Sequence, residues 1–112
     1  MKRKGIGEFE ELVLLAICVL ENKAYSIAIK DEVESRTGRN FNVSAIQTTL
    51  YRMEDKGLVE SILGESNQIR GGKRKRLFSV TAYGLKSLSE IKEVRNNFWN
   101  DISSLVLKSG EL

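Results

Sequence analysis

The sequence contains no histidine, no proline and only one cysteine, Cys18. Without histidine the chain lacks the commonest general acid or base, and Cys18 has no second cysteine with which to form a disulfide or a metal site. The glycines never gather into a phosphate-binding motif. These absences argue against an enzyme, and we expect no cofactor and no bound metal.

A long apolar run is lacking as well. The longest run, residues 12–20, is far shorter than the roughly 20 residues that span a bilayer, and it follows Glu8, Glu10 and Glu11. The first part of the chain also lacks the pattern of a secretory signal. We therefore expect no membrane partner and a location in a reducing cytoplasm.

The chain is short, at 112 residues, and has no low-complexity linker or internal repeat. A chain of this length has room for one hydrophobic core and not for two. We expect one globular unit, with a main domain over residues 1–82 and a C-terminal helix over residues 83–108.

Positive charge is concentrated in one segment. The formal net charge is +3, but residues 66–76 contain five lysine and arginine residues and no acidic residue. Such a focus suits a polyanion, either a nucleic acid or an anionic membrane surface. A solvated charged loop is the alternative that composition leaves open.

Two helices are expected in the first third of the chain. Apolar residues recur at helical spacing from Phe9 to Leu20, which predicts a largely buried helix over residues 8–21. A second apolar face runs from Tyr25 to Val33 and predicts a helix over residues 26–36. Gly38 follows in the position of a helix C-cap.

The next predicted helix has a strong start signal, because Ser44 and Gln47 fit the Ser-x-x-Gln capping box. Ile46, Leu50 and Met53 form its buried edge, and Gly57 marks its end. Its other faces carry side chains able to bond base edges or phosphates. These candidate DNA contacts are Ser44, Gln47, Thr48, Tyr51 and Arg52.

A hairpin is expected after this helix. Residues 58–63 and 77–81 are short, contain β-forming residues and bracket a polar segment with a glycine pair at its tip. Glycine lets one backbone approach another closely, and the surrounding cations suit phosphates. The candidate phosphate contacts are Arg70, Gly71, Gly72, Lys73, Arg74, Lys75 and Arg76.

Thr81 can cap a long C-terminal helix with an apolar seam of its own. The seam residues are spaced alternately three and four apart, like the a and d positions of a coiled coil: Leu88, Ile91, Arg95, Phe98, Ile102 and Leu105. Such a helix needs a partner, and we expect a homodimer interface. Arg95 has two interpretations, an ion pair across the dimer or a side chain that simply points outward.

This order of elements is typical of a winged helix-turn-helix, a mainly α fold with a small β-hairpin. We expect the third helix to read base sequence and the hairpin loop, or wing, to supply affinity for phosphates. The hypothesis is therefore a sequence-specific regulator that binds double-stranded DNA. The rival hypothesis is a winged-helix module that docks onto another protein, against which the basic loop and the polar third helix argue.

The chain resembles the PadR-like bacterial transcription regulators over roughly residues 7–90. Four segments carry the resemblance: residues 7–16 (GEFEELVLLA), 24–29 (AYSIAI), 44–59 (SAIQTTLYRMEDKGLV) and 71–84 (GGKRKRLFSVTAYG). The length resembles the short-tailed branch of that family, which has one C-terminal helix.

The resemblance implies a repressor that binds a palindromic operator as a homodimer in the bacterial cytoplasm. It also implies that the C-terminal helix packs on the first helix of the other subunit, where Phe9 and Leu12 lie. Two positions depart from the family. Gln47 stands where tyrosine is usual, so that the tyrosine's DNA contact is not carried over, and Leu77 with Phe78 replaces paired aromatics.

Three further residues have two interpretations each. In some short-tailed relatives an aromatic residue of the C-terminal helix lines a pore for flat, hydrophobic drugs, so that Trp99 and Phe98 are candidate contacts for a small hydrophobic or aromatic ligand. Packing of the dimer seam is the alternative role of Trp99. Cys18 is either a redox sensor or, as we favour, a small buried hydrophobe. Tyr25 belongs either to the DNA contact or to the core.

Overall fold

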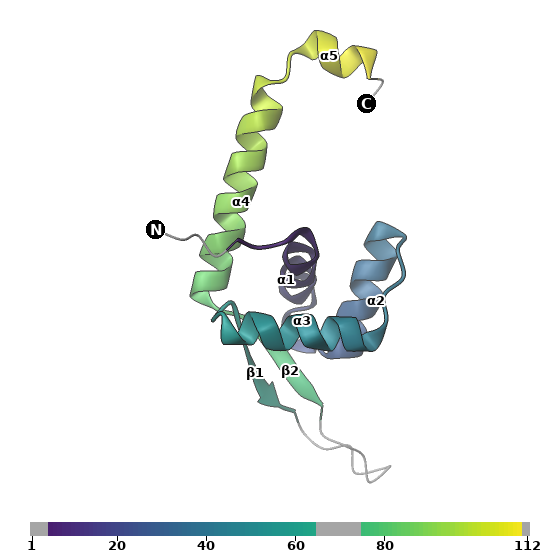
Figure 1. The fold of residues 1–112 in the computed structure, drawn as a ribbon, viewed down its shortest axis with the longest axis vertical. Coiled ribbons are helices and arrows are strands. Elements are labelled where there is room, and N and C mark those ends of the chain that lie inside the picture. Colours follow the sequence, from purple (N-terminus) through teal and green to yellow (C-terminus); the bar gives the residue numbers. More distant parts are fainter. Residues whose placement is uncertain (1–4, 65–74, 111–112) are drawn as a thin grey trace.

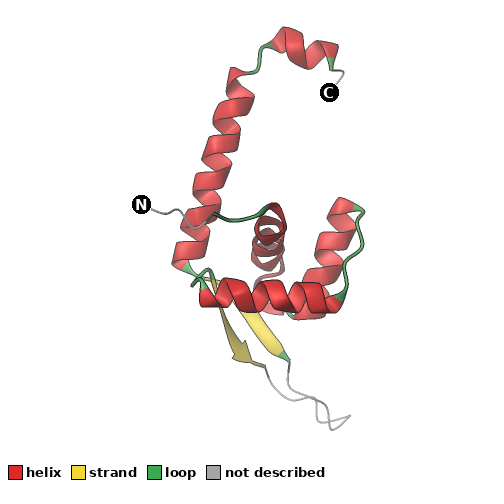
Figure 2. Cartoon of the chain, viewed as in Figure 1, coloured by secondary structure: helices red, strands yellow, loops and turns green. Residues whose placement is uncertain are grey.

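The computed structural model describes residues 5–64 and 75–110. Within them the chain forms a mainly helical fold with one antiparallel hairpin (Figures 1 and 2). The elements follow in the order α1 (Glu8–Leu20), a 3-10 turn η1 (Glu21–Lys23), α2 (Ser26–Thr37), α3 (Val43–Asp55), β1 (Val59–Leu63), β2 (Arg76–Val80), α4 (Ala82–Asp101) and α5 (Ser104–Ser109). The predicted fold class, a winged helix with a C-terminal helix, is confirmed.

The core lies where α1, α2 and α3 meet the base of the hairpin. Each helix contributes residues from one face, as the apolar spacing predicted, and Phe78 from β2 closes the cluster. The largest fully buried side chains are Val13, Leu14, Ile17, Ile29, Ile46, Leu50, Met53 and Val59. The expectation of a largely buried α1 is wrong on one side, because Leu15 and Val19 are exposed.

The turn between α2 and α3 is held by a carboxylate. Gly38 ends α2 in the left-handed conformation, with φ at 71°, as its C-cap position predicted. One oxygen of Glu34 accepts the Phe41 amide at 2.8 Å, and Lys30 pairs with the same side chain at 3.2 Å. The Phe41 amide and then Lys30 lower the pKa of the Glu34 carboxyl below its ordinary value. The chain therefore enters α3 from a fixed direction.

The capping box predicted at the start of α3 is wrong. The helix begins at Val43, and the side chain of Asn42 accepts the Ala45 amide at 3.0 Å. Ser44 lies inside the first turn and donates its hydroxyl hydrogen to the same Asn42 oxygen, at 3.0 Å. Asparagine is as good an N-cap as serine, so that the earlier of two possible caps starts the helix.

The hairpin pairs Val59 with Val80 at its base and Leu63 with Arg76 at its outer described end. Beyond that pair the Gly64 amide donates to the Lys75 carbonyl at 2.6 Å. On the side of β2 away from β1, the Phe78 amide donates to the Ala24 carbonyl at 3.0 Å, just before α2. The hairpin is thereby fixed between the start of α2 and the end of α3.

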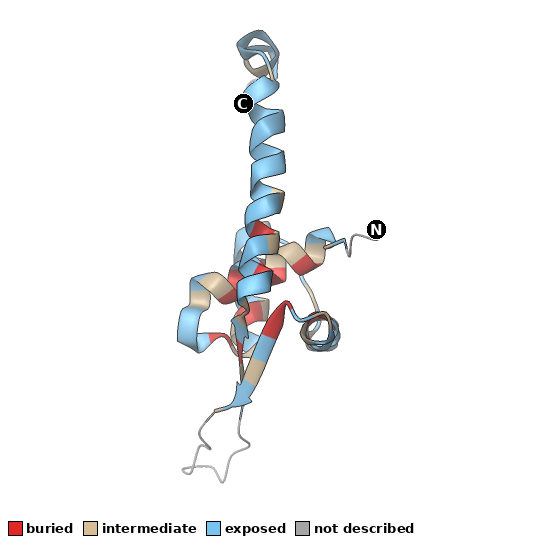
Figure 3. Ribbon diagram, turned by 90° about the vertical axis from the view of Figure 1, so that its left-hand side faces the viewer, coloured by how far each residue is buried: buried red, intermediate tan, exposed pale blue. Residues whose placement is uncertain are grey.

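Helix α4 begins at the hairpin and then leaves the body of the molecule (Figures 1 and 3). Thr81 caps it as predicted, since its hydroxyl oxygen accepts the Gly84 amide at 3.0 Å. Only Gly84 and Leu88 of this helix are buried. The prediction of one helix over residues 83–108 is wrong, because Ile102 is extended and Ser103 caps a separate helix, α5, by accepting the Val106 amide.

Gly84 is required at its position by the space available. A Cβ atom there would lie 2.3 Å from the Leu58 carbonyl oxygen and 2.7 Å from a methyl of Val80. The hairpin and α4 therefore approach each other closely only because residue 84 has no side chain.

We predict that Gly84→Ala lowers the free energy of unfolding by about 3 kcal/mol, because the methyl group clashes with backbone that cannot move independently. Helix propensity alone would give the opposite sign, since alanine favours a helix by about 1 kcal/mol over glycine. Denaturant unfolding measures the difference. Gly5→Ala, where the methyl meets open space, is the matched control, and a Gly84→Ala variant as stable as the parent would contradict the packing described.

Candidate nucleic-acid interface

Helix α3 presents a continuous polar surface because its buried residues all lie on the opposite side. Ile46, Leu50 and Met53 are fully buried and fix the rotation of the helix about its axis. Every residue predicted to contact DNA from this helix is exposed: Ser44, Gln47, Thr48, Tyr51 and Arg52. Together they offer hydroxyl, amide and guanidinium groups on one rigid element.

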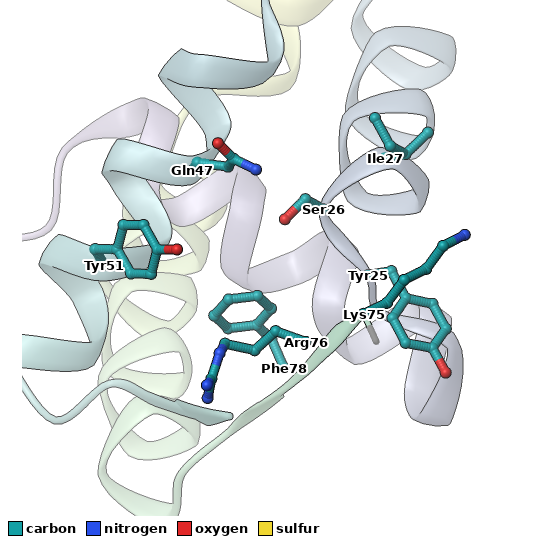
Figure 4. Close-up of a pocket in the computed structure, with 8 residues that line it drawn as sticks. All are labelled: Tyr25, Ser26, Ile27, Gln47, Tyr51, Lys75, Arg76 and Phe78. Carbon is teal, nitrogen blue, oxygen red and sulfur yellow. The ribbon is translucent and has the colours of Figure 1, made fainter. Parts of the chain in front are cut away.

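A hollow of about 250 Å³ lies beside this surface (Figure 4). Gln47 and Tyr51 border it from α3, while Arg76 and Phe78 border it from β2. The start of α2 forms the remaining wall with Tyr25, Ser26 and Ile27, and Lys75 completes the lining. The hollow thus combines cationic, hydroxyl and amide groups from three elements.

The two described cations of the wing are placed differently from each other. The Lys75 ammonium nitrogen lies 5.7 Å from the centre of the Tyr25 ring, a cation–π distance. The Arg76 guanidinium donates to the Ser61 hydroxyl oxygen at 3.0 Å. Both cationic side chains are exposed, so that their charge is available to an anion. Tyr25, whose role the sequence left open, is half-buried beside Lys75 and lines the hollow.

The remaining predicted wing residues lie outside the described residues. These are Arg70, Gly71, Gly72, Lys73 and Arg74. The described residues on either side of residues 65–74, Gly64 and Lys75, are hydrogen-bonded to each other. The structure therefore locates the root of the predicted wing next to α3.

The predicted dimer seam divides into a buried and an exposed part. Leu88 belongs to the core of its own chain, Ile91 and Ile102 are half-buried, and Phe98 and Leu105 are exposed by 72% and 76%. Trp99, the candidate ligand contact, is exposed by 55%. On α1, Phe9 and Leu12 pack against the core and keep part of their surface exposed.

Arg95 pairs within its own chain. Its guanidinium contacts the Glu11 carboxylate of α1 at 2.8 Å. The hydrogen bond to Glu11, supported by the charge of that group, raises the pKa of the arginine further above its ordinary value. The pair ties the second half of α4 to the first turn of α1.

Other kinds of site find little support in the part of the chain described. No three cysteine, aspartate or glutamate side chains gather there in a way that could hold a metal ion. Burial raises the pKa of the half-buried Cys18 thiol, which disfavours the reactive thiolate. Within the same residues, no helix is both long and apolar enough to cross a bilayer.

Sequence reasoning missed several residues beside the predicted site. Ser26 and Ile27 line the hollow from α2. Ser61 accepts a hydrogen bond from Arg76 and donates one to Glu54. Their sequence signal is weak, because serine and glutamate are common on any surface. Only the pairing of β1 with β2 and its position beside α3 bring them together.

Comparison with known proteins finds a matching family and a related bacterial sequence. The transcriptional regulator PadR-like family matches residues 14–90 of the chain. An uncharacterized protein of Lysinibacillus sphaericus is 30% identical over 105 residues, which cover 89% of this chain and 85% of that protein.

Solved structures share the fold. A PadR-like transcriptional regulator from Bacillus cereus superposes with a TM-score of 0.68 at 20% identity, over 88% of this chain and 90% of that one. A PadR family regulator from Eggerthella lenta gives 0.63 at 20% identity, over 88% and 86%. RosR from H. salinarum gives 0.69 at 19% identity, over 98% and 92%.

We predict that Asn42→Ala destabilises the protein by about 1 kcal/mol, because it removes the cap of α3. Ser44→Ala is the matched control, since its hydroxyl contacts the cap and not the helix backbone. Thermal unfolding followed by circular dichroism compares the two variants. A larger loss for Ser44→Ala would show that the serine is the cap after all.

Proposed function

The chain belongs to the PadR-like family of transcriptional regulators, and we propose that it binds double-stranded DNA with α3 and the basic hairpin as a homodimer. Members of this family are regulators and not enzymes. The observation that carries the proposal is the exposed polar face of α3, flanked at the hollow by Lys75 and Arg76.

The two parts of this surface suit different parts of a duplex. A helix fits the major groove, where glutamine and arginine can each make two hydrogen bonds to a base edge. Gln47 and Arg52 are exposed on α3 for that role. Lysine and arginine at the hairpin suit phosphates, whose contacts give affinity without sequence information. Sequence is thus read by α3 and affinity comes mainly from the hairpin.

Homodimerisation is supported by the apolar surface of the C-terminal helices. The outer part of α4 and α5 exposes large apolar side chains that the described residues leave uncovered: Val94, Phe98, Trp99, Leu105 and Val106. Several large apolar side chains exposed in one region of a small protein are typical of an interaction site. A twofold dimer would present two α3 helices to a palindromic operator, and repression follows if that operator overlaps a promoter.

The exposed rings of Phe98 and Trp99 also support a second role for the same surface. A flat, aromatic ligand could stack on these rings between two subunits and shift the distance between the two α3 helices, which would relieve repression. Trp99 is the only tryptophan of the chain, so that its fluorescence reports on ligand and on dimer alike.

The DNA contact is tested by a salt titration. Lys73, Arg74 and Lys75 are changed together to alanine, and we expect weaker binding to every duplex and a log–log salt slope reduced by about 0.9 for each phosphate that is no longer neutralised. The control changes Lys86, Lys92 and Lys108 to alanine, which removes the same charge from α4 and α5. Equal effects of the two triple variants would contradict a specific role of the wing.

Substitutions on α3 test sequence discrimination in the same DNA-binding measurements. Gln47→Ala and Arg52→Ala should each lower the ratio of specific to random-sequence affinity by about 1–3 kcal/mol, the discrimination that one side chain bonded to a base edge supplies. Unchanged discrimination in both variants would move sequence reading away from α3.

The dimer is tested at two exposed positions one helical turn apart. Val94 and Phe98 changed together to lysine should give a monomer in sedimentation velocity, because four charges would have to be buried in the twofold interface. Asn96 and Asn100 changed to lysine add the same charge with the same spacing on another side of α4. A persistent dimer in the first variant would place the interface elsewhere.

A further inference from the structure

The side chains of Arg76, Ser61 and Glu54 form a hydrogen-bonded network at the root of the wing. The Arg76 guanidinium donates to the Ser61 hydroxyl oxygen at 3.0 Å, and that hydroxyl donates to a Glu54 carboxylate oxygen at 2.8 Å. Ser61 lies opposite Phe78 and Arg76 opposite Leu63 in the hairpin, so that Ser61 and Arg76 share the face of the hairpin that packs beside α3.

We propose that Ser61 and Glu54 are positioning residues, which hold the Arg76 guanidinium ready for a phosphate of bound DNA. The proposal rests on the DNA binding proposed above and adds how one contact is prepared before binding. Arg76 is exposed and borders the hollow beside Gln47 and Tyr51, while Ser61 and Glu54 behind it are half-buried. Ser61 and Glu54 therefore hold Arg76 from the protein side, and the exposed guanidinium lies on the side proposed to face DNA.

Ser61 stands between Glu54 and Arg76, and this order determines whether the carboxylate neutralises the guanidinium. Serine has one hydroxyl hydrogen, and because it is donated to Glu54 the oxygen lone pairs are left to face Arg76. Among the described residues, the ion pairs within 4 Å do not include one between Glu54 and Arg76. The arginine is thus oriented through a neutral group and keeps most of its donors for a phosphate.

An arginine held in this way loses less freedom when DNA binds. Immobilising a long side chain weakens binding, and an arginine oriented beforehand avoids part of that loss. Ser61→Ala removes the acceptor without changing any charge. We expect it to weaken DNA binding about threefold to tenfold and to leave the salt slope unchanged. Arg76→Ala, in contrast, should lower the slope by about 0.9, as one phosphate contact predicts.

Glu54→Ala separates positioning from simple electrostatics by the sign of its effect. Removing a carboxylate near DNA strengthens binding if only charge matters. Positioning predicts weaker binding in the parent, and stronger binding only in the Arg76→Ala background, where no arginine remains to be held. Tighter binding of Glu54→Ala in the parent background would overturn the role assigned to Glu54.

The decisive measurement is a double-mutant cycle on one duplex, selected by the parent protein from a random library. The effect of Ser61→Ala should disappear when Arg76 is already alanine, and Ser61→Thr, which keeps the hydroxyl, should bind like the parent. Ser79→Ala is the control, because Ser79 lies on the other face of the same hairpin. Each variant is measured well below its melting temperature.

The possible failures are distinguishable. If the parent selects and binds no duplex, the proposed function fails and this inference fails with it. If the parent binds and Ser61→Ala binds equally well, only the positioning role is wrong. An equal loss for Ser61→Ala with and without Arg76 would also overturn it, because the serine would then act through something other than the arginine.

Discussion

The structure depends on the hydrogen bonds of Thr81, which join the start of α4 to the segment between α3 and β1. The threonine hydroxyl has one hydrogen, which the Gly57 carbonyl at 2.7 Å and the Leu58 carbonyl at 3.1 Å share, and its oxygen accepts the amide of Gly84. One residue thereby connects the segment between α3 and β1 with the end of β2 and the start of α4. Because Gly84 has no side chain, α4 lies directly against the Leu58 carbonyl. These contacts therefore fix where the hairpin and α4 meet the end of α3, and the Phe78–Ala24 and Arg95–Glu11 contacts hold the two elements farther along.

Carboxylates from α1 and α2 hold α3 at both ends. Glu34 of α2 accepts the Phe41 amide just before α3 begins. Glu10 of α1, which is 7% exposed, pairs with Lys56 just after α3 ends and accepts the Gly7 amide as well. A helix fixed at its ends and along its inner face can leave its outer face free of internal contacts, which is the requirement for a surface that meets another molecule.

The sequence predicted the elements well where the signal was periodic or local. Apolar spacing located α1, α2 and α3, and Gly38 and Thr81 were recognised as caps because their roles depend on neighbouring residues only. The start of α3 was misplaced since Asn42 and Ser44 are both good caps, and local preference does not choose between them. The break after Asp101 was missed because heptad spacing continues through it, whereas Ser103 starts a new helix.

The candidate site was predictable in its outline and not in its connections. Exposure of Gln47 and Arg52 follows from the buried positions on the same helix, which the sequence displays directly. Contacts such as Glu11 with Arg95 join residues 84 positions apart, so that no local pattern reveals them. The heptad spacing places Arg95 in a seam for another subunit, whereas in the structure its partner, Glu11, belongs to its own chain.

Thr81 and Gly84 fix the start of α4 at the hairpin, so that a tilt of this helix would pivot about that end. The helix rises by about 1.5 Å per residue, so that Asp101 lies about 25 Å along the axis from Gly84. A rigid tilt of about 10° at the pivot would carry the far end roughly 4 Å while the near end scarcely moved. Large displacements at the tip thus correspond to small ones beside α3, and the Glu11–Arg95 pair lies partway along the arm, where it resists such a tilt.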